Sequence, residues 1–203
     1  MHEACVRVSG VDLRTWMTEE VSGIGERFAS SIVAHIPADQ WRIRVGATDL
    51  GASSIAALLF HMTLHCDLAI TTVVRHHAPL RLEWSERLGL AGWASTAGLS
   101  EAEDPSLTSA LDLDALVEYH HAVQAATLDW LDRVAITVLD SVPDSEYRLG
   151  HLAGVGASEV PWLIRMWSGR SIGWFAQWPA VGHRQGHLGE MTGIRSQLGR
   201  SPF

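Results

Sequence analysis

Four stretches of helical periodicity constrain the fold of this chain more than any other feature of its sequence. In each stretch apolar residues recur three or four positions apart, which places them on one face of a helix. Four amphipathic helices with almost no strand pattern pack most economically as a four-helix bundle. We therefore predict an all-α fold, a four-helix bundle with long connecting loops. The predicted helices cover residues 12–36, 52–77, 112–141 and 172–198.

The segments between these helices carry weaker patterns. QWRIRV, over residues 40–45, alternates apolar and basic side chains and predicts a short strand. Ser53 and Ser54 are candidate N-caps of the second helix. Residues 80–110 lack sustained periodicity and are expected to form a long crossover loop. A short helix is expected over residues 159–167, after a glycine-rich link.

Length and composition bound the class of protein. With 203 residues, the chain is predicted to form a single domain over residues 1–203. No run of 18 apolar residues occurs, and the first residues lack the apolar core of a signal peptide, so we expect a cytoplasmic protein. Two cysteines, Cys5 and Cys66, make no disulfide or CxxC pattern, and both are expected to be reduced.

The charge and the missing motifs exclude several classes of function. The formal net charge is -8, and the 15 basic residues, all arginine, are scattered, so we expect no binding to nucleic acid. The absence of lysine excludes a catalytic lysine. The sequence also lacks a GxSxG elbow, a P-loop and a GxGxxG turn, which are the usual motifs of serine hydrolases and nucleotide-binding domains.

A pair of histidines near the end of the chain suggests a metal site. His183 and His187 lie four residues apart in GHRQGHLGEM, so they share one helix face and their imidazoles can reach one ion. With 11 histidines in 203 residues, however, roughly 0.6 such pairs arise by chance. The sequence has two, the other being His61 and His65. The spacing alone therefore leaves open a pair of solvated histidines.

A site of the catalytic type needs a third protein ligand from another helix. His61 follows the apolar run IAALLF, where an imidazole is costly unless it is hydrogen-bonded or ligating. His65, one turn further on, is expected to be a partly exposed histidine, with a fourth ligand or a group supporting the site as the alternative. His120 and Glu190 are the other candidates for the third ligand. The predicted metal ligands are His61, His183 and His187.

Glycines and tryptophans bear on the surroundings of this site. Each glycine costs about 0.8–1 kcal/mol relative to alanine inside a helix, so a glycine stripe beside the two histidines indicates a close crossing by another helix. Some of the tryptophans are candidates to wall an apolar pocket near the ion. The stripe consists of Gly182, Gly186, Gly189 and Gly193, and the candidate tryptophans are Trp84, Trp93, Trp174 and Trp178.

Two segments carry a resemblance to a known family. ALLFHMTLHCDLAI, together with PAVGHRQGHLGEMTGIRSQLG, resembles the DinB-like (YfiT-like) family of metal-dependent bacterial proteins. The resemblance implies a four-helix bundle in which one histidine of the second helix and an HxxxH pair of the fourth bind a divalent ion. By position these histidines are His61, His183 and His187. Similar proteins include transferases and isomerases that use a low-molecular-weight thiol such as mycothiol or bacillithiol.

Together these observations give two hypotheses of function. The first is a divalent-metal-dependent enzyme, with zinc or nickel as the ion, that acts as a thiol-dependent S-transferase or isomerase or as a hydrolase. The alternative is a non-catalytic metal-binding stress-response bundle, in which His65 or Glu190 closes the fourth coordination position. The expected partners are a small-molecule substrate and a second copy of the chain in a homodimer, with no nucleic acid and no membrane.

Overall fold

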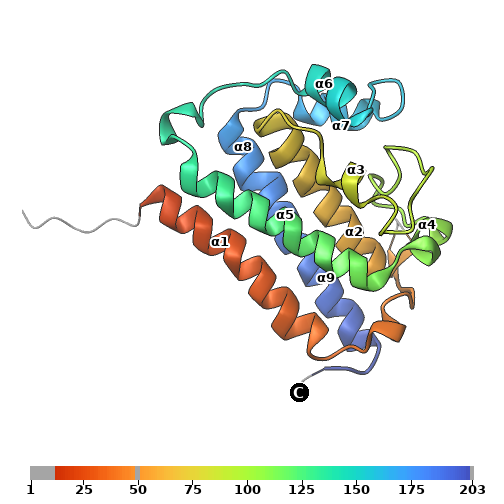
Figure 1. Cartoon of the computed structure of the whole chain (residues 1–203). Coiled ribbons are helices and arrows are strands. Elements are labelled where there is room, and N and C mark those ends of the chain that lie inside the picture. The colour runs from red at the N-terminus through yellow and green to blue at the C-terminus, as the bar shows by residue number, and fades with distance from the viewer. Residues whose placement is uncertain (1–11, 49–50, 202–203) are drawn as a thin grey trace, which may run out of the picture.

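The computed structural model describes residues 12–48 and 51–201, and this part of the chain is predominantly helical (Figure 1). The all-α prediction is confirmed. Of the two cysteines, Cys66 is a buried free thiol and Cys5 lies outside the described residues.

Helices are found in all four regions where periodicity predicted them. The first, second and last of these regions contain a π-helical segment next to the α-helix, and the third does not. The last region also begins with a separate short helix. The elements are α1 (Leu13–Phe28) with a π-helical end (Ala29–Val33), α2 (Ile55–Cys66) with a π-helical extension (Asp67–Val74), α5 (Leu113–Arg133), and α8 (Ile172–Gln177) joined by a π-helical turn (Trp178–Gly182) to α9 (His183–Gln197).

Shorter elements connect these helices. A small antiparallel hairpin pairs Val45 with Ser53 and Thr48 with Gly51. The region predicted as a long crossover loop contains two short helices, and the glycine-rich link contains one that the sequence did not indicate. The elements are β1 (Val45–Thr48), β2 (Gly51–Ser53), α3 (Leu80–Trp84), α4 (Pro105–Ala110), α6 (Ser145–Arg148), α7 (Pro161–Trp167), 3-10 turns at Ala38–Gln40 and Ile136–Val138, and a π-helical turn at Leu149–Ala153.

The strand predicted over residues 40–45 was wrong for all but its last residue. Trp41 is buried, and its indole N–H donates to the carbonyl of Ile36 at 3.0 Å. This bond holds the chain in a turn, because the indole reaches back to Ile36, in the bend that follows the helical segment ending at Val33. Strand pairing begins only at Val45.

The third helix is shorter than the predicted 112–141. It ends at Arg133, and Val134 has an extended backbone. Arg14, on α1, donates from its guanidinium to the carbonyls of Leu131 at 2.9 Å and Val134 at 2.6 Å. The last carbonyls of a helix have no partner within it, so a cation from a neighbouring helix satisfies them and favours an end at this point.

Helix α2 lies at the centre of the fold. It packs against α5 and α9, and α1 packs against the same two helices from the other side (Figure 1). Ser54 caps α2, its hydroxyl accepting from the amide of Ala57 at 3.2 Å. Among the described residues, Ile55–Val74 is the one helical stretch long and apolar enough to cross a membrane, but 94% of it is buried inside the protein, as in the core helix of a soluble protein.

The glycine stripe of α9 does not mark a close helix crossing. A Cβ added at Gly186, Gly189 or Gly193 would meet no atom within 4 Å, so the predicted crossing was wrong for these three positions. Gly182 differs, because a Cβ there would lie 2.9 Å from the indole ring of Trp178. Only this first glycine is required by packing, at the π-helical turn that leads into α9.

Candidate metal centre

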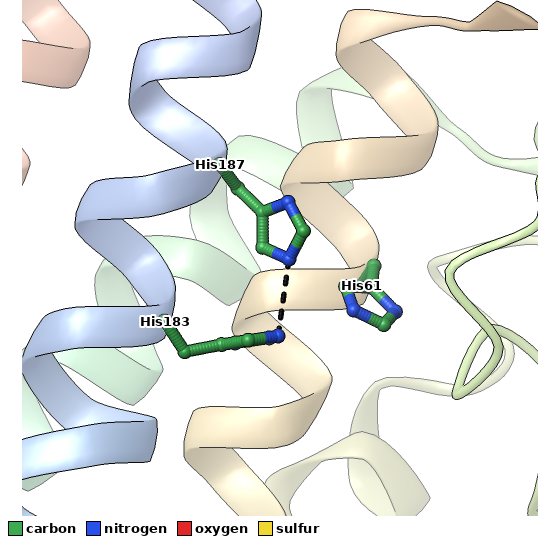
Figure 2. A group of neighbouring side chains, drawn as sticks. All are labelled: His61, His183 and His187. Atoms are coloured by element: carbon green, nitrogen blue, oxygen red, sulfur yellow. Dashed lines mark hydrogen bonds between the residues drawn. The ribbon is translucent and has the colours of Figure 1, made fainter. Parts of the chain in front are cut away.

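The structure brings His61, His183 and His187 together, as predicted. Figure 2 shows the rings of His183 and His187 projecting from α9 toward His61 on α2. One ligand atom from each of the three residues lies within 4.8 Å of the other two. His183 Nε2 is 3.0 Å from His187 Nε2. Because the α9 pair lies one helical turn apart, the packing of α2 against α9 is what completes the group.

Backbone contacts orient the His61 ring. Its Nδ1 lies 2.9 Å from the carbonyl oxygen of Gly98, an acceptor, so the proton is on Nδ1. The Nε2 atom is therefore a free lone pair, and it is buried without a hydrogen-bond partner among the described residues. Burial, followed by the neighbouring His187, lowers the pKa of His61 to about 4, which keeps the ring neutral at pH 7.

A carboxylate orients the His187 ring in the same way. His187 Nδ1 donates to Glu190 Oε2 at 3.1 Å, which leaves Nε2 of His187 as an acceptor. The same hydrogen bond lowers the pKa of Glu190, so this carboxylate is ionised at neutral pH. His187 Nε2 lies 3.0 Å from Nε2 of His183, and burial holds the pKa of His183 far below its usual value. Carboxylate and carbonyl partners of this kind are the usual orienting groups of metal-binding histidines.

The remaining candidate ligands have other partners. His65 is buried, so the expectation of a partly exposed histidine was wrong, and its Nε2 donates to the carbonyl of Leu99 at 3.1 Å. His120 lies in the core, hydrogen-bonded to the hydroxyl of Thr63 at 3.0 Å and 5.1 Å from the Phe28 ring. Neither belongs to the histidine group, and the carboxylate of Glu190 serves as the partner of His187.

A buried polar network fixes α9 beside the site. Arg184 follows His183 and is 1% exposed. Its guanidinium donates to the side-chain oxygen of Gln124 on α5, and Gln124 donates to the carbonyl of Val21 on α1 at 2.8 Å. Buried donors left without acceptors are costly, so this chain of hydrogen bonds restricts the position of α9. It thereby positions the histidine pair relative to α2.

A second network of hydrogen bonds holds α3 and the loop that follows it against α2. Asp67, buried at the end of α2, accepts from the amides of Leu80 at 3.1 Å and Arg81 at 2.9 Å and from the hydroxyl of Tyr119 at 2.8 Å. Arg81 donates to the carbonyl of Ala94 at 3.0 Å. These bonds tie the start of α3 and the loop after it to α2, and this loop leads directly to the carbonyls that orient His61 and His65.

Gly98 allows this loop to approach α2, and we expect its replacement to be costly. Its φ is +85°, and an added Cβ would lie 2.4 Å from Phe60 Cε1. Gly98→Ala is expected to lower the free energy of unfolding by about 3 kcal/mol, since overlap and a left-handed backbone both contribute. Gly92→Ala is the matched control, with φ of +80° and no atom within 4 Å, and is expected to cost about 1 kcal/mol. Equal losses in urea unfolding would contradict an effect of the Phe60 contact.

Three cavities adjoin the histidine group. One of about 300 Å³ is lined by His187, Glu190 and Gly193 among others. A second, of about 70 Å³, is lined by His61, His65 and His183, and a third, of about 20 Å³, by His61. Glu101 lines all three cavities. Glu101 could not be singled out from the sequence, because it lies in an acidic loop without periodicity.

The tryptophans near the site are mostly not the predicted ones. Trp162, Trp167 and Trp178 line the 70 Å³ cavity, and only Trp178 was among the predicted four. Trp84 instead lies 6.0 Å from the ring of Tyr119, away from the histidines. Trp93 and Trp174 pack on the main hydrophobic core and line none of the three cavities. The sequence pointed to an aromatic wall and identified one of its three tryptophans, Trp178.

The donor set fits a divalent ion. Two imidazole nitrogens bound to one tetrahedral ion at 2.0–2.1 Å would be about 3.3 Å apart, close to the 3.0 Å between Nε2 of His183 and Nε2 of His187. The buried, unpartnered Nε2 of His61 supplies the third nitrogen. Neutral imidazoles suit zinc, nickel, copper and iron, so the ligand type does not choose among these ions.

Comparison with known proteins identifies a related fold but no family. No family model and no curated protein matches this sequence. A conserved protein of Enterococcus faecalis, known from a crystal structure, is similar in structure, with a TM-score of 0.58 and 20% sequence identity over 94% of this chain and 99% of that one. At this identity the similarity concerns the fold alone.

Proposed function

We propose that His61, His183 and His187 bind one divalent ion, zinc or nickel, and that the chain is a metal-dependent enzyme of the DinB-like four-helix-bundle type. The observation that carries the proposal is the Nε2 atom of His61, which is buried, has no hydrogen-bond partner among the described residues, and lies with the α9 pair. An isolated polar atom of this kind is costly in a core unless a ligand satisfies it.

The surroundings favour an open site over a closed one. The two residues expected to close the fourth position, His65 and Glu190, both lie outside the group whose ligand atoms are within 4.8 Å of one another. Three histidines with no fourth protein ligand are the pattern of catalytic sites. This arrangement supports an enzyme over the alternative of a structural metal site in a stress-response protein.

The reaction we propose is transfer or isomerisation with a low-molecular-weight thiol. A bound divalent ion would act as a Lewis acid that lowers the pKa of a thiol placed at the open position. The chain would bind the thiol in the cavity beside His187, keep His61 and His183 neutral through burial, and orient His61 through Gly98 and His187 through Glu190. A hydrolase, with water at the same position, is the second candidate. We propose a cytoplasmic protein that acts on a small molecule as a homodimer.

Thiol coordination gives a direct test. The protein, purified without a His-tag and loaded with one cobalt(II) ion per chain, is expected to develop a saturable sulfur-to-cobalt charge-transfer absorption in the near ultraviolet when 2-mercaptoethanol is added. A free coordination position next to a cavity is the reason. Cobalt that binds at one equivalent without any such absorption would contradict the thiol reaction and leave the hydrolase.

A further inference from the structure

The walls around the histidine group contain acidic, aromatic and neutral groups. Among the described residues that line the three cavities, none is an arginine, and the sequence contains no lysine. Glu101 lines all three cavities and Glu190 the largest, while Glu103 and Asp104 line the smallest. Glu103 is ion-paired with Arg44 at 3.6 Å, whereas Glu101 lines all three cavities, so a ligand that enters from any of them meets a carboxylate and no arginine in the wall.

Two of these carboxylates are placed close to the ligand position by the site itself. Glu190 accepts the bond from His187 Nδ1 and lines the 300 Å³ cavity. Glu101 follows the segment whose carbonyls, at Gly98 and Leu99, accept from His61 and His65. The two histidines thus hold residues 98 and 99, from which the chain continues to Glu101 in the walls of the cavities.

Aromatic rings in the wall of one cavity also attract cations, as the carboxylates do. Trp162, Trp167 and Trp178 line the cavity bounded by His61 and His183, and Glu101 lines the same cavity. The faces of indole rings are electron-rich and attract cations, most strongly where water is excluded. An ammonium group in this cavity would contact aromatic faces and a carboxylate together.

We propose that the thiol bound at this site carries a positive charge, as an aliphatic amine does at neutral pH. The inference rests on the proposed thiol function and names its substrate class. A divalent ion and one thiolate leave one positive charge at the centre, and the side chains of Glu101 and Glu190 line the cavities around it. Arg184, the buried cation next to His183 in the sequence, donates to Gln124 and lines none of the three cavities. The buried, unpartnered Nε2 of His61 independently marks this place as a ligand site.

The proposal is tested with three small thiols that differ in charge: cysteamine, 2-mercaptoethanol and 3-mercaptopropionate. Each is titrated into the cobalt-loaded protein, and Kd is read from the charge-transfer absorption. The readout is the ratio of the Kd of 3-mercaptopropionate to that of cysteamine, measured in the native protein and in variants. Intrinsic differences between the thiols cancel when the ratios of two proteins are compared.

Glu101→Gln removes one carboxylate and keeps the side-chain size. We expect it to lower the ratio by about fivefold, because loss of one negative charge beside a hydrated cavity weakens binding of the cationic thiol and strengthens binding of the anionic one. Glu118→Gln, which removes a carboxylate from the exposed face of α5 and lines none of the three cavities, is expected to leave the ratio unchanged. Cobalt content is measured for each protein and is expected to stay at one ion per chain, because Glu101 is not among the proposed metal ligands.

The outcomes separate this inference from the function on which it rests. A ratio that falls in Glu101→Gln and not in Glu118→Gln supports a cationic thiol. An unchanged ratio in Glu101→Gln, or an equal fall in both variants, overturns the inference and leaves thiol binding intact. No charge-transfer absorption with any of the three thiols overturns the thiol function and the inference with it.

Discussion

His183→Ala and His187→Ala are each expected to abolish stoichiometric metal binding, reducing the ion content of the purified protein from about one per chain to near zero. Each change removes one of three nitrogen ligands from a site with no fourth protein ligand in its group. Loss of an outer, orienting partner already weakens metal sites by roughly 10–100-fold, and loss of a ligand is expected to exceed that. Metal analysis of protein prepared without a His-tag gives the measurement.

The same variants are expected to lose the response to a chelator. An ion present at about a thousand times its Kd stabilises the folded state by about 4 kcal/mol. For a chain of this size that corresponds to a melting temperature higher by about 10 °C, which EDTA removes from the native protein but not from the variants. Metal that binds equally to the native protein and to both variants would contradict the site.

Two further histidines serve as controls. His121 is exposed on α5, so His121→Ala is expected to keep both the ion and the chelator response. His120 is buried against Phe28 and Thr63, so His120→Ala is expected to lower stability without emptying the site. If His120→Ala empties the site while His61→Ala leaves it full, the third ligand is His120.

The helices and the grouping of the three histidines could be predicted because both depend on local spacing. Apolar residues at helical intervals specify which face of α2 or α9 is buried, and that face decides which of their histidines can meet. His61 stood out because an imidazole follows an apolar run that must lie in the core. The meeting of His183 and His187 could be predicted because it requires only that this segment be a helix. Each inference used residues close together in the sequence.

The rest of the site could not be predicted because it depends on long-range contacts. Glu101 and the carbonyls of Gly98 and Leu99 lie in a loop whose path follows from hydrogen bonds to α2, including the bond from Arg81 to Ala94. Nothing periodic marks such a loop. The glycine stripe led to a wrong prediction because glycine in a helix does not always mark a close crossing by another helix. At Gly193 the missing side chain leaves room for a cavity instead.

Acid is expected to unfold the metal-free protein between about pH 6 and pH 4. Burial lowers the pKa of His61 to about 4 and holds the pKa of His65, His120 and His183 well below 6.5. The folded protein therefore takes up these protons later than the unfolded chain. Stability is fully present above pH 6.5, the unfolded pKa, and is lost as the pH falls toward the folded pKa values.

The size of this effect follows from proton counting. Each proton bound by the unfolded chain and not by the folded protein costs about 1.4 kcal/mol per pH unit, so four histidines give a slope of about 5 kcal/mol per pH unit. Asp67 acts in the opposite direction, because burial raises its pKa and the folded state takes up that proton first. A domain is stable by about 5–15 kcal/mol, so a fall of one to two pH units removes most of this free energy.

Urea unfolding of the metal-free protein, repeated from pH 7.5 to pH 4.5, measures this slope. His65→Gln keeps a donor for the carbonyl of Leu99 and removes one titrating ring, so it is expected to reduce the slope by about one quarter. His121→Ala, at an exposed position, is expected to leave the slope unchanged. A stability that stays constant between pH 6.5 and pH 4.5 would mean that the buried histidines accept protons in the folded state. The site would then be more hydrated than its geometry indicates. Water would satisfy the Nε2 atom of His61, and this atom would no longer require an ion.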